Sequence, residues 1–246
     1  MEPIKIGYRF KLDKSRSENF EITLDENNVE VLDRNIKDFP EWTQLDCHKC
    51  PHCPLDSMYH PHCPAALSLV EVVQRCQDIM SYEQVDLEVA IGDKKICQHT
   101  SAQKALSALI GLLMSTSGCP HLDFFRPMAR LHLPMATEQD TVFRAAGMYL
   151  LAQYFRAAEG RDIDLTLRGL KTIYRNLHQL NLCISKRLRT ASEADSSVNA
   201  VILLDLFSTV IPIIIEDNLE DIRDWFDPYM SELFDRVLEQ ADKEQD

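Results

Sequence analysis

The sequence is short of positive charge. Its 26 lysines and arginines are outnumbered by 39 aspartates and glutamates, which gives a net charge of −13. Binding to nucleic acid or to an anionic membrane surface needs clustered basic side chains, so this balance argues against both partners. A long uninterrupted apolar run is also missing, because the most apolar stretch, 198–215, contains Asn199, Asp205 and Pro212. A membrane-spanning helix needs about twenty mostly apolar residues, so we expect a buried helix here.

Common signatures of catalysis and export are absent as well. The sequence contains no glycine-rich phosphate loop, no Gly-x-Ser-x-Gly elbow and no His-Glu-x-x-His helix, so it leaves open whether the protein is an enzyme. Its first residues, Met-Glu-Pro-Ile-Lys, have neither the basic start nor the apolar core of a signal peptide. We therefore expect a cytoplasmic protein. Clustered cysteines in that compartment indicate metal binding or catalysis more often than disulfides.

What the sequence does contain is a concentration of soft metal ligands. Four of the eight cysteines and four of the eight histidines fall within 47–64, Cys-His-Lys-Cys-Pro-His-Cys-Pro-Leu-Asp-Ser-Met-Tyr-His-Pro-His-Cys-Pro. A structural zinc site needs four nitrogen or sulfur ligands in a tetrahedron, and two ligands two residues apart form one knuckle. The spacing gives two such pairs, and the prolines between them lower the entropic cost of closing the loop. We predict zinc bound by Cys50, Cys53, His60 and Cys63. The alternative ligands are Cys47, His48 and His62.

Two other interpretations of this segment remain open. The run Cys47-x-x-Cys50-x-x-Cys53, followed by Cys63-Pro64, is similar to the cysteine spacing that binds iron–sulfur clusters. The tetrapeptide Cys50-Pro-His-Cys53 also occurs in strongly oxidising dithiol enzymes, in which the two central residues tune thiolate stability. That motif normally opens a helix, and Pro54 fits such a helix poorly. A loop that binds nothing is the remaining interpretation.

Outside this segment, fewer residues suggest chemistry. Cys119-Pro-His121 repeats the Cys-Pro-His triplet, and Cys119 is either a distant ligand or, as we expect, a buried thiol. The spacing of Cys76 and Cys183 in apolar helical patterns predicts core positions. Arg126 and Arg130 share a helical face, where they could grip an acidic ligand or pair with acidic side chains.

The charge is unevenly distributed. Residues 216–246 contain twelve acids and three bases, whereas residues 126–189 contain eleven bases and five acids. We expect these two regions to pack together and partly neutralise each other. A basic region that binds a small acidic ligand is the alternative.

Hydrophobic periodicity predicts an α+β fold. Residues 3–11 and 20–24 alternate as a hairpin, 29–32 suggests a short third strand, and 85–89 with 95–99 suggests a second hairpin that could join the same sheet. From residue 101 onward only helical patterns occur, among them a capping box at 137–140. We predict a β-rich region with a Cys/His knuckle and one helix over 1–100, followed by an all-helical bundle over 101–246.

Several motifs are similar to those of an uncharacterised bacterial protein family, a domain of unknown function. They are His48-x-Cys-Pro-x-Cys-Pro-Leu55, His60-Pro-x-Cys-Pro-Ala65, Ser117-Gly-Cys-Pro120, Arg126-Pro-Met-x-Arg-x-His-Leu-Pro134 and Met148-Tyr-Leu-Leu-Ala-Gln-Tyr154. The resemblance covers most of the chain after about residue 45. It implies no activity, and it favours the four predicted zinc ligands over Cys47.

The sequence therefore supports two functional hypotheses. The first is a non-enzymatic, zinc-stabilised interaction or regulatory protein with a protein partner or a small acidic ligand. Structural zinc can contribute about 10–16 kcal/mol of apparent binding free energy to a folded state. The second is a metal- or thiol-based redox protein.

Overall fold

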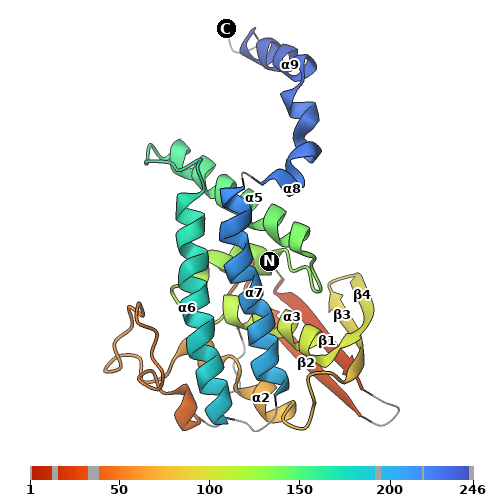
Figure 1. Ribbon diagram of the computed structural model, residues 1–246, viewed down its shortest axis with the longest axis vertical. Helices are drawn as coiled ribbons and strands as arrows, with labels where there is room; N and C mark the ends of the chain where they lie inside the picture. Colours follow the sequence, from red (N-terminus) through yellow and green to blue (C-terminus); the bar gives the residue numbers. More distant parts are fainter. Residues whose placement is uncertain (1, 13–15, 33–38, 192–194, 218, 244–246) are drawn as a thin grey trace.

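The computed structural model describes residues 2–12, 16–32, 39–191, 195–217 and 219–243. The strands in these ranges form a four-stranded antiparallel sheet in the order β2-β1-β3-β4 (Figure 1). Their bounds are β1 Ile4–Lys11, β2 Ser17–Leu24, β3 Gln84–Ile91 and β4 Lys94–Ser101. Both predicted hairpins are confirmed, and they join into one sheet through the pairing of β1 with β3.

The alternation in sequence explains how the sheet is buried. Successive strand side chains point to opposite faces, and in the three strands β2, β1 and β3 alternate residues are buried. Tyr8 pairs with Phe20 on one side and with Val89 on the other, so one row of the buried face crosses three strands. The predicted third strand at 29–32 forms only an isolated bridge, Leu24 to Val31. A short segment with one bridge cannot extend the sheet.

The region between the two hairpins is mostly irregular. It contains the 3₁₀ turn η1 (Glu41–Thr43) and the short helices α1 (Pro64–Leu67) and α2 (Val70–Arg75). The sequence predicted one helix over 66–76, but the structure has two, with the break at Ser68 and Leu69. The Ser68 hydroxyl donates to the carbonyl oxygen of Ala65, which is the local bonding by which serine competes with helix continuation.

The remaining chain is helical. Its elements are α3 (Ala102–Ser115), η2 (Asp123–Phe125), α4 (Arg126–Arg130), α5 (Glu138–Ala158), α6 (Arg168–Ala191), α7 (Ser196–Glu216), α8 (Glu220–Arg223), η3 (Asp224–Met230) and α9 (Glu232–Lys243). The predicted capping box is confirmed, since the Thr137 hydroxyl accepts from Asp140 N and the Asp140 carboxylate accepts from Thr137 N. Gly160 follows α5 with a φ of 69°, the left-handed conformation expected just after a helix. The predicted cap Asn218 lies outside the described residues.

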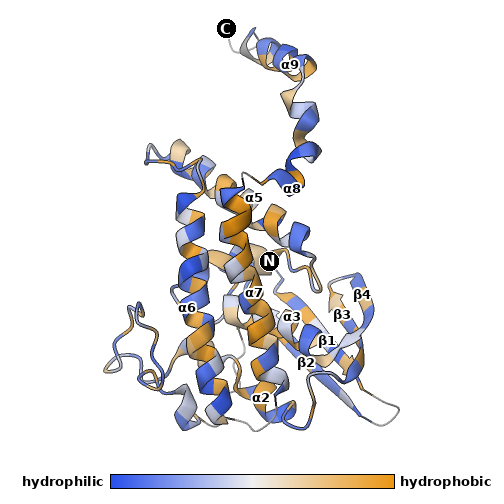
Figure 2. Cartoon of the chain, in the orientation of Figure 1, coloured by the Kyte–Doolittle hydropathy of each residue, from blue (hydrophilic) through white to orange (hydrophobic). Residues whose placement is uncertain are grey.

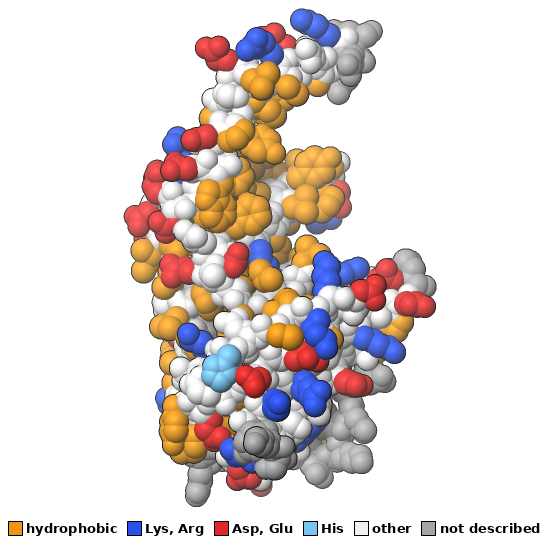
Figure 3. Space-filling view, turned by 90° about the vertical axis from the view of Figure 1, so that its right-hand side faces the viewer, with side chains coloured by type: hydrophobic (Ala, Val, Ile, Leu, Met, Phe, Trp, Pro, Cys, Tyr) orange, Lys and Arg blue, Asp and Glu red, His pale blue; other side chains and the backbone are white. Residues whose placement is uncertain are grey.

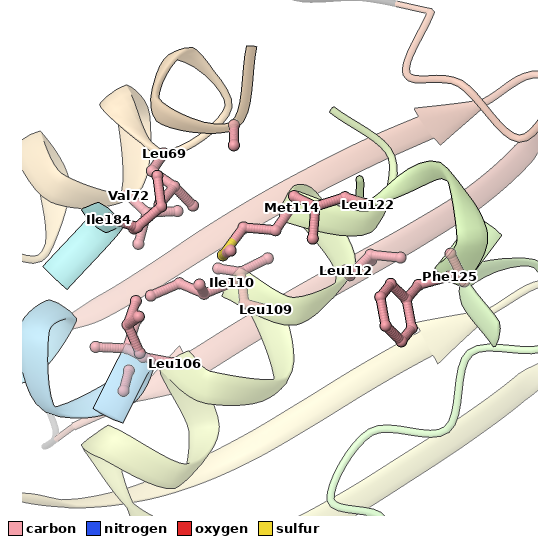
Figure 4. Close-up of a cluster of buried hydrophobic side chains, with 14 of the residues drawn as sticks. Leu69, Val72, Leu106, Leu109, Ile110, Leu112, Met114, Leu122, Phe125 and Ile184 are labelled. Atoms are coloured by element: carbon pink, nitrogen blue, oxygen red, sulfur yellow. The ribbon is translucent and has the colours of Figure 1, made fainter. Parts of the chain in front are cut away.

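One hydrophobic core joins the sheet to the helices. Helix α3 packs on β3 and β4 with one face and on α7 with another, and α6 lies beside α7 (Figure 1). In the close-up of this core, Leu106 and Ile110 of α3 meet Val72 of α2 and Ile184 of α6 (Figure 4). The change from strands to helices falls at Ser101, next to the predicted boundary, and both parts contribute to the same core.

Helix α7 does not end at Pro212, although the sequence predicts a kink or a stop there. Proline lacks an amide donor and usually disrupts a helix interior, yet α7 continues to Glu216. Within the described ranges, α7 is the helix that is long and apolar enough to cross a membrane, and 39% of that window is buried inside the protein. It packs against α3 and α6, and Figure 2 shows hydrophobic residues along much of its length.

The last elements form an arm that extends beyond the helical bundle (Figure 1). Trp225 and Phe226 in η3 contact Phe143 of α5, while α9 has no buried residue among those described. Exposed apolar side chains gather on the arm and on the neighbouring part of the bundle (Figure 3). The predicted neutralisation between the basic and acidic regions is therefore limited: Lys171 and Arg175 of α6 lie 3.5 and 3.9 Å from Glu216.

Candidate metal centre

The segment from Thr43 to Cys63 is a loop whose two ends are paired. Cys63 N donates to the Thr43 carbonyl oxygen at 2.8 Å, and Leu45 N donates to the Pro61 carbonyl oxygen at 2.9 Å. Inside the loop, Cys53 N donates to the Cys50 carbonyl oxygen at 3.0 Å. This last bond closes the tight turn that a Cys-x-x-Cys pair needs to present both thiols on one side. We call residues 43–63 the knuckle loop.

A buried arginine fixes the knuckle loop to helix α6. Arg187 is only 1% exposed. Its guanidinium donates to the carbonyl oxygens of Trp42 at 2.8 Å, Gln44 at 2.6 Å and Leu45 at 2.9 Å. These carbonyls cannot bond within a helix or sheet, so the fork of guanidinium donors satisfies them. The first turn of the loop is thereby held against the C-terminal half of α6.

This docking gathers thiols from distant parts of the sequence. Cys50 interacts electrostatically with Cys183 of α6, with Cys63 and with Cys119. Cys119, which follows α3, in turn lies near Cys63 and Cys53. Cys63 and Cys119 belong to the hydrophobic core, and Cys50 and Cys53 pack against it. Five of the eight cysteines therefore converge beneath the knuckle loop. We call them the thiol cluster.

Burial disfavours the thiolate forms of Cys119 and Cys50 when no cation is near. The pKa of Cys119 is raised to about 12, chiefly by desolvation and also by its neighbouring thiols. The pKa of Cys50 is raised further by burial, then by Cys183 and Cys63. A free thiolate at Cys50 is therefore disfavoured, whereas a nucleophilic cysteine needs a lowered pKa. A bound metal reverses this preference, because a coordinating thiol loses its proton.

Two histidines lie beside the thiol cluster. The His52 ring packs edge-on against His121, with the ring centroids 4.2 Å apart, and His121 Nε2 lies 2.8 Å from the His52 carbonyl oxygen. The pKa of His52 is lowered by burial and then by His121. Among the described residues His52 Nε2 is one of the few buried side-chain atoms without a hydrogen-bond partner. A buried polar atom without a hydrogen-bond partner costs free energy, so a bound group that pairs with this nitrogen would remove that cost.

The other predicted ligands point elsewhere. His60 is exposed, and its backbone N donates to the Asp56 carbonyl oxygen. His62 Nδ1 lies 2.8 Å from the Thr43 hydroxyl, and the His62 ring packs against Phe39. His48 is exposed and has a φ of 44°. Cys47 is half-buried. Of the four predicted zinc ligands, the structure thus brings together Cys50, Cys53 and Cys63.

The sequence interpretation gave Cys119 only as an alternative distant ligand and favoured a buried thiol there, and it placed Cys183 in the core. A signal was present for the first, because Cys50, Cys53, Cys63 and Cys119 are each followed directly by proline. No comparable signal marks Cys183, which the sequence placed in the core. Among the described residues, no group of three or more His, Cys, Asp or Glu side chains is positioned to hold one metal ion. Rotation of the thiols about χ1 would have to direct them at a shared group.

Arg126, the other predicted ligand-binding residue, has structural partners. Its Nη2 lies 2.7 Å from Asp123 and 2.9 Å from Glu30. It does not pair with the acidic C-terminal region, which the sequence offered as its partner. Arg130, four residues later, is exposed. We therefore assign Arg126 to the docking of α4 against the β2 end of the sheet.

The fold and the thiol cluster define an α+β protein with a sulfur-rich, half-buried centre. A family model matches residues 6–227, and the chain belongs to that family, the domain of unknown function DUF6901. No curated protein and no solved structure matches the chain. The family membership agrees with the resemblance seen in the sequence and assigns no activity.

Proposed function

We propose that the chain is an iron–sulfur protein whose cluster is bound by Cys50, Cys53, Cys63 and Cys119. The observation that carries this proposal is the convergence of the four Cys-Pro cysteines on one place, although up to 69 residues separate them. Cysteine thiolates are the usual ligands of such clusters, and a ligand followed by proline is typical of ferredoxin runs. Cys183 is then a fifth thiol that interacts electrostatically with Cys50.

The spacing of the donors favours a cluster over a single ion. The four ligands of one zinc ion meet within about 2.3 Å of the metal. An iron–sulfur cluster places several iron and sulfide atoms between its thiolates, so its ligands stand further apart. Five thiols from the knuckle loop, the segment after α3 and α6 suit this larger group better than a four-ligand zinc site. The unpartnered His52 Nε2 gives a donor for a cluster sulfur, and such hydrogen bonds tune cluster potentials.

The position of the centre suits electron transfer. Cys50 and Cys53 are half-buried, and the intervening and following loop residues Pro51 and Pro54 are exposed. A partner protein that docks on this loop would come close to the cluster without entering the core. The function we propose is one-electron transfer: the cluster accepts an electron from a reduced carrier protein and passes it to an oxidised one.

Structural zinc is the second candidate, in an interaction or regulatory protein without enzymatic activity. It is favoured by the Cys50–Cys53 turn, which the 3.0 Å backbone bond closes as in a zinc knuckle. His60 would have to turn inward to complete the set with Cys50, Cys53 and Cys63. Cys119, which is already near Cys63, could serve instead.

Anaerobic purification followed by analysis of iron, acid-labile sulfide and zinc separates the candidates. Iron and sulfide in equal amounts, with a brown colour that bleaches on reduction, would support the cluster. A colourless protein with about one zinc per chain would support the second candidate. Protein with neither group after anaerobic reconstitution would refute both.

Paired variants test the ligand set. We expect Cys119→Ala to lose the metal, whereas Cys76→Ala, at an equally buried thiol outside the thiol cluster, keeps it. Likewise Cys53→Ser should lose it, whereas Cys97→Ser on the exposed strand β4 should not. Retention by Cys119→Ala together with loss by His60→Ala would show that the metal follows the ligand set predicted from sequence.

A further inference from the structure

A second candidate site lies among the helices of the bundle. A cavity of about 410 Å³ opens between α3, α4, α5, α6 and α7, within the range of small-molecule sites. Its walls are mainly apolar, with Leu112, Phe125, Met128, Leu177 and Phe207 among them. Ala108 and Gly111 of α3 line it too, and their small size leaves the space open.

The cavity has one charged end. Arg144 of α5 lines it, and its Nη2 donates to the carbonyl oxygens of Met128 at 2.7 Å and Leu131 at 3.1 Å. These two bonds orient the guanidinium and leave its other N–H groups for a ligand. Burial lowers the Arg144 pKa, but a guanidinium stays protonated at neutral pH.

No carboxylate balances that charge inside the cavity. Among the described lining residues the charged side chains are Arg144 and Lys104, and none is an aspartate or glutamate. His132 also lines the cavity, where burial lowers its pKa to about 4, so its ring is neutral at pH 7. The ring is held by a hydrogen bond between Nε2 and the Tyr8 hydroxyl. The site thus offers one half-buried cation, which also interacts with Asp140 of the same helix, together with neutral polar groups and apolar walls.

We propose that this cavity binds an amphipathic carboxylic acid, with the carboxylate on Arg144 and the hydrocarbon body between α3, α6 and α7. A planar guanidinium matches a carboxylate with two parallel hydrogen bonds, and such bonds are strong where water is excluded. A polyphosphate would carry more charge than one guanidinium can neutralise, and it has no hydrocarbon part to pack against the apolar walls. A neutral hydrocarbon would leave the guanidinium desolvated without a partner. The site is separate from the thiol cluster, so the inference does not depend on the metal.

Titration of the full chain with decanoate tests the proposal. Loss of a hydrogen bond to a charged group costs about 1.5–3 kcal/mol, which corresponds to about a 10- to 150-fold weaker Kd. Decanol should therefore bind at least about tenfold more weakly than decanoate. Arg144→Gln should weaken decanoate to a similar extent, while Arg156→Gln, an exposed arginine of the same helix, should leave Kd unchanged.

A second variant keeps the test valid if Arg144→Gln disturbs the fold. Ala108→Phe fills the cavity from α3 and leaves Arg144 and its carbonyl partners intact, so we expect it to abolish decanoate binding while retaining the wild-type circular dichroism spectrum. Three results would overturn the proposal: decanoate does not bind below its micellar concentration, decanol binds as tightly, or folded Ala108→Phe binds decanoate as wild type does.

Discussion

Arg187 offers the sharpest test of how the fold builds the thiol cluster. The Arg187→Met substitution removes three hydrogen bonds from a charged, 1% exposed donor to the carbonyl oxygens of residues 42, 44 and 45. Each such bond contributes about 1.5–3 kcal/mol, or about 4.5–9 kcal/mol together before any offset. The desolvation cost of the buried guanidinium, several kcal/mol, disappears with it. We therefore expect a net loss of about 3–5 kcal/mol in the free energy of unfolding.

Chemical and thermal denaturation followed by circular dichroism measures this loss. For a chain of this size 1 kcal/mol corresponds to about 2–4 °C, so Tm should fall by about 10 °C. Arg187→Lys should recover part of the stability, because an ammonium group is a single point donor and cannot reach three carbonyls as a fork does. The control is Arg189→Met, an exposed position of the same helix, which should change stability by less than about 0.5 kcal/mol.

The reasoning is refuted if Arg187→Met stays within about 1 kcal/mol of wild type. It is also refuted if Arg189→Met is equally destabilising. Either result would mean that the knuckle loop docks on α6 without help from the buried guanidinium.

Three further predictions concern the rest of the fold. Burial lowers the pKa of His132 to about 4 from 6.5, so between these pH values the unfolded chain binds a proton that the folded chain does not. The free energy of unfolding should therefore fall by up to about 3 kcal/mol as the pH drops from 6.5 to 4. Urea denaturation at a series of pH values should show this slope, and His132→Phe should abolish it. Gly169→Ala would place a Cβ against the Tyr149 hydroxyl, so we expect a lower Tm and the loss of the hydrogen bond that this hydroxyl donates to Asp164 in the loop before α6. Gly147→Ala, which meets no atom within 4 Å, is the neutral control. Thr137→Ala removes the N-terminal cap of α5 and should cost about 1 kcal/mol, whereas Thr137→Ser should cost little.

Local pattern was enough to predict most elements. Alternation identified β1, β2 and β3, because a half-buried strand exposes every second side chain, and β4 was predicted as the returning strand of the second hairpin. The capping box placed the start of α5 at Thr137. Errors arose where local signals conflicted with packing: proline suggested a stop in α7, but the packing of α7 against α3 and α6 holds the helix together through Pro212. The break between α1 and α2 had too weak a signature to see.

The sequence by itself determined the alternation that makes the sheet, the helical stripes, and the presence of a cysteine-rich loop stiffened by proline. Only the tertiary structure decided which other cysteines lie near that loop. Cys119 and Cys183 lie 56 and 120 residues beyond Cys63, and no short-range spacing rule reaches so far. They join the loop because the Arg187 guanidinium binds its first carbonyls, because α3 packs on the sheet and because α6 packs beside α7 in the same core. Hydrophobic burial and one satisfied buried charge, rather than ligand spacing, thus selected the members of the thiol cluster.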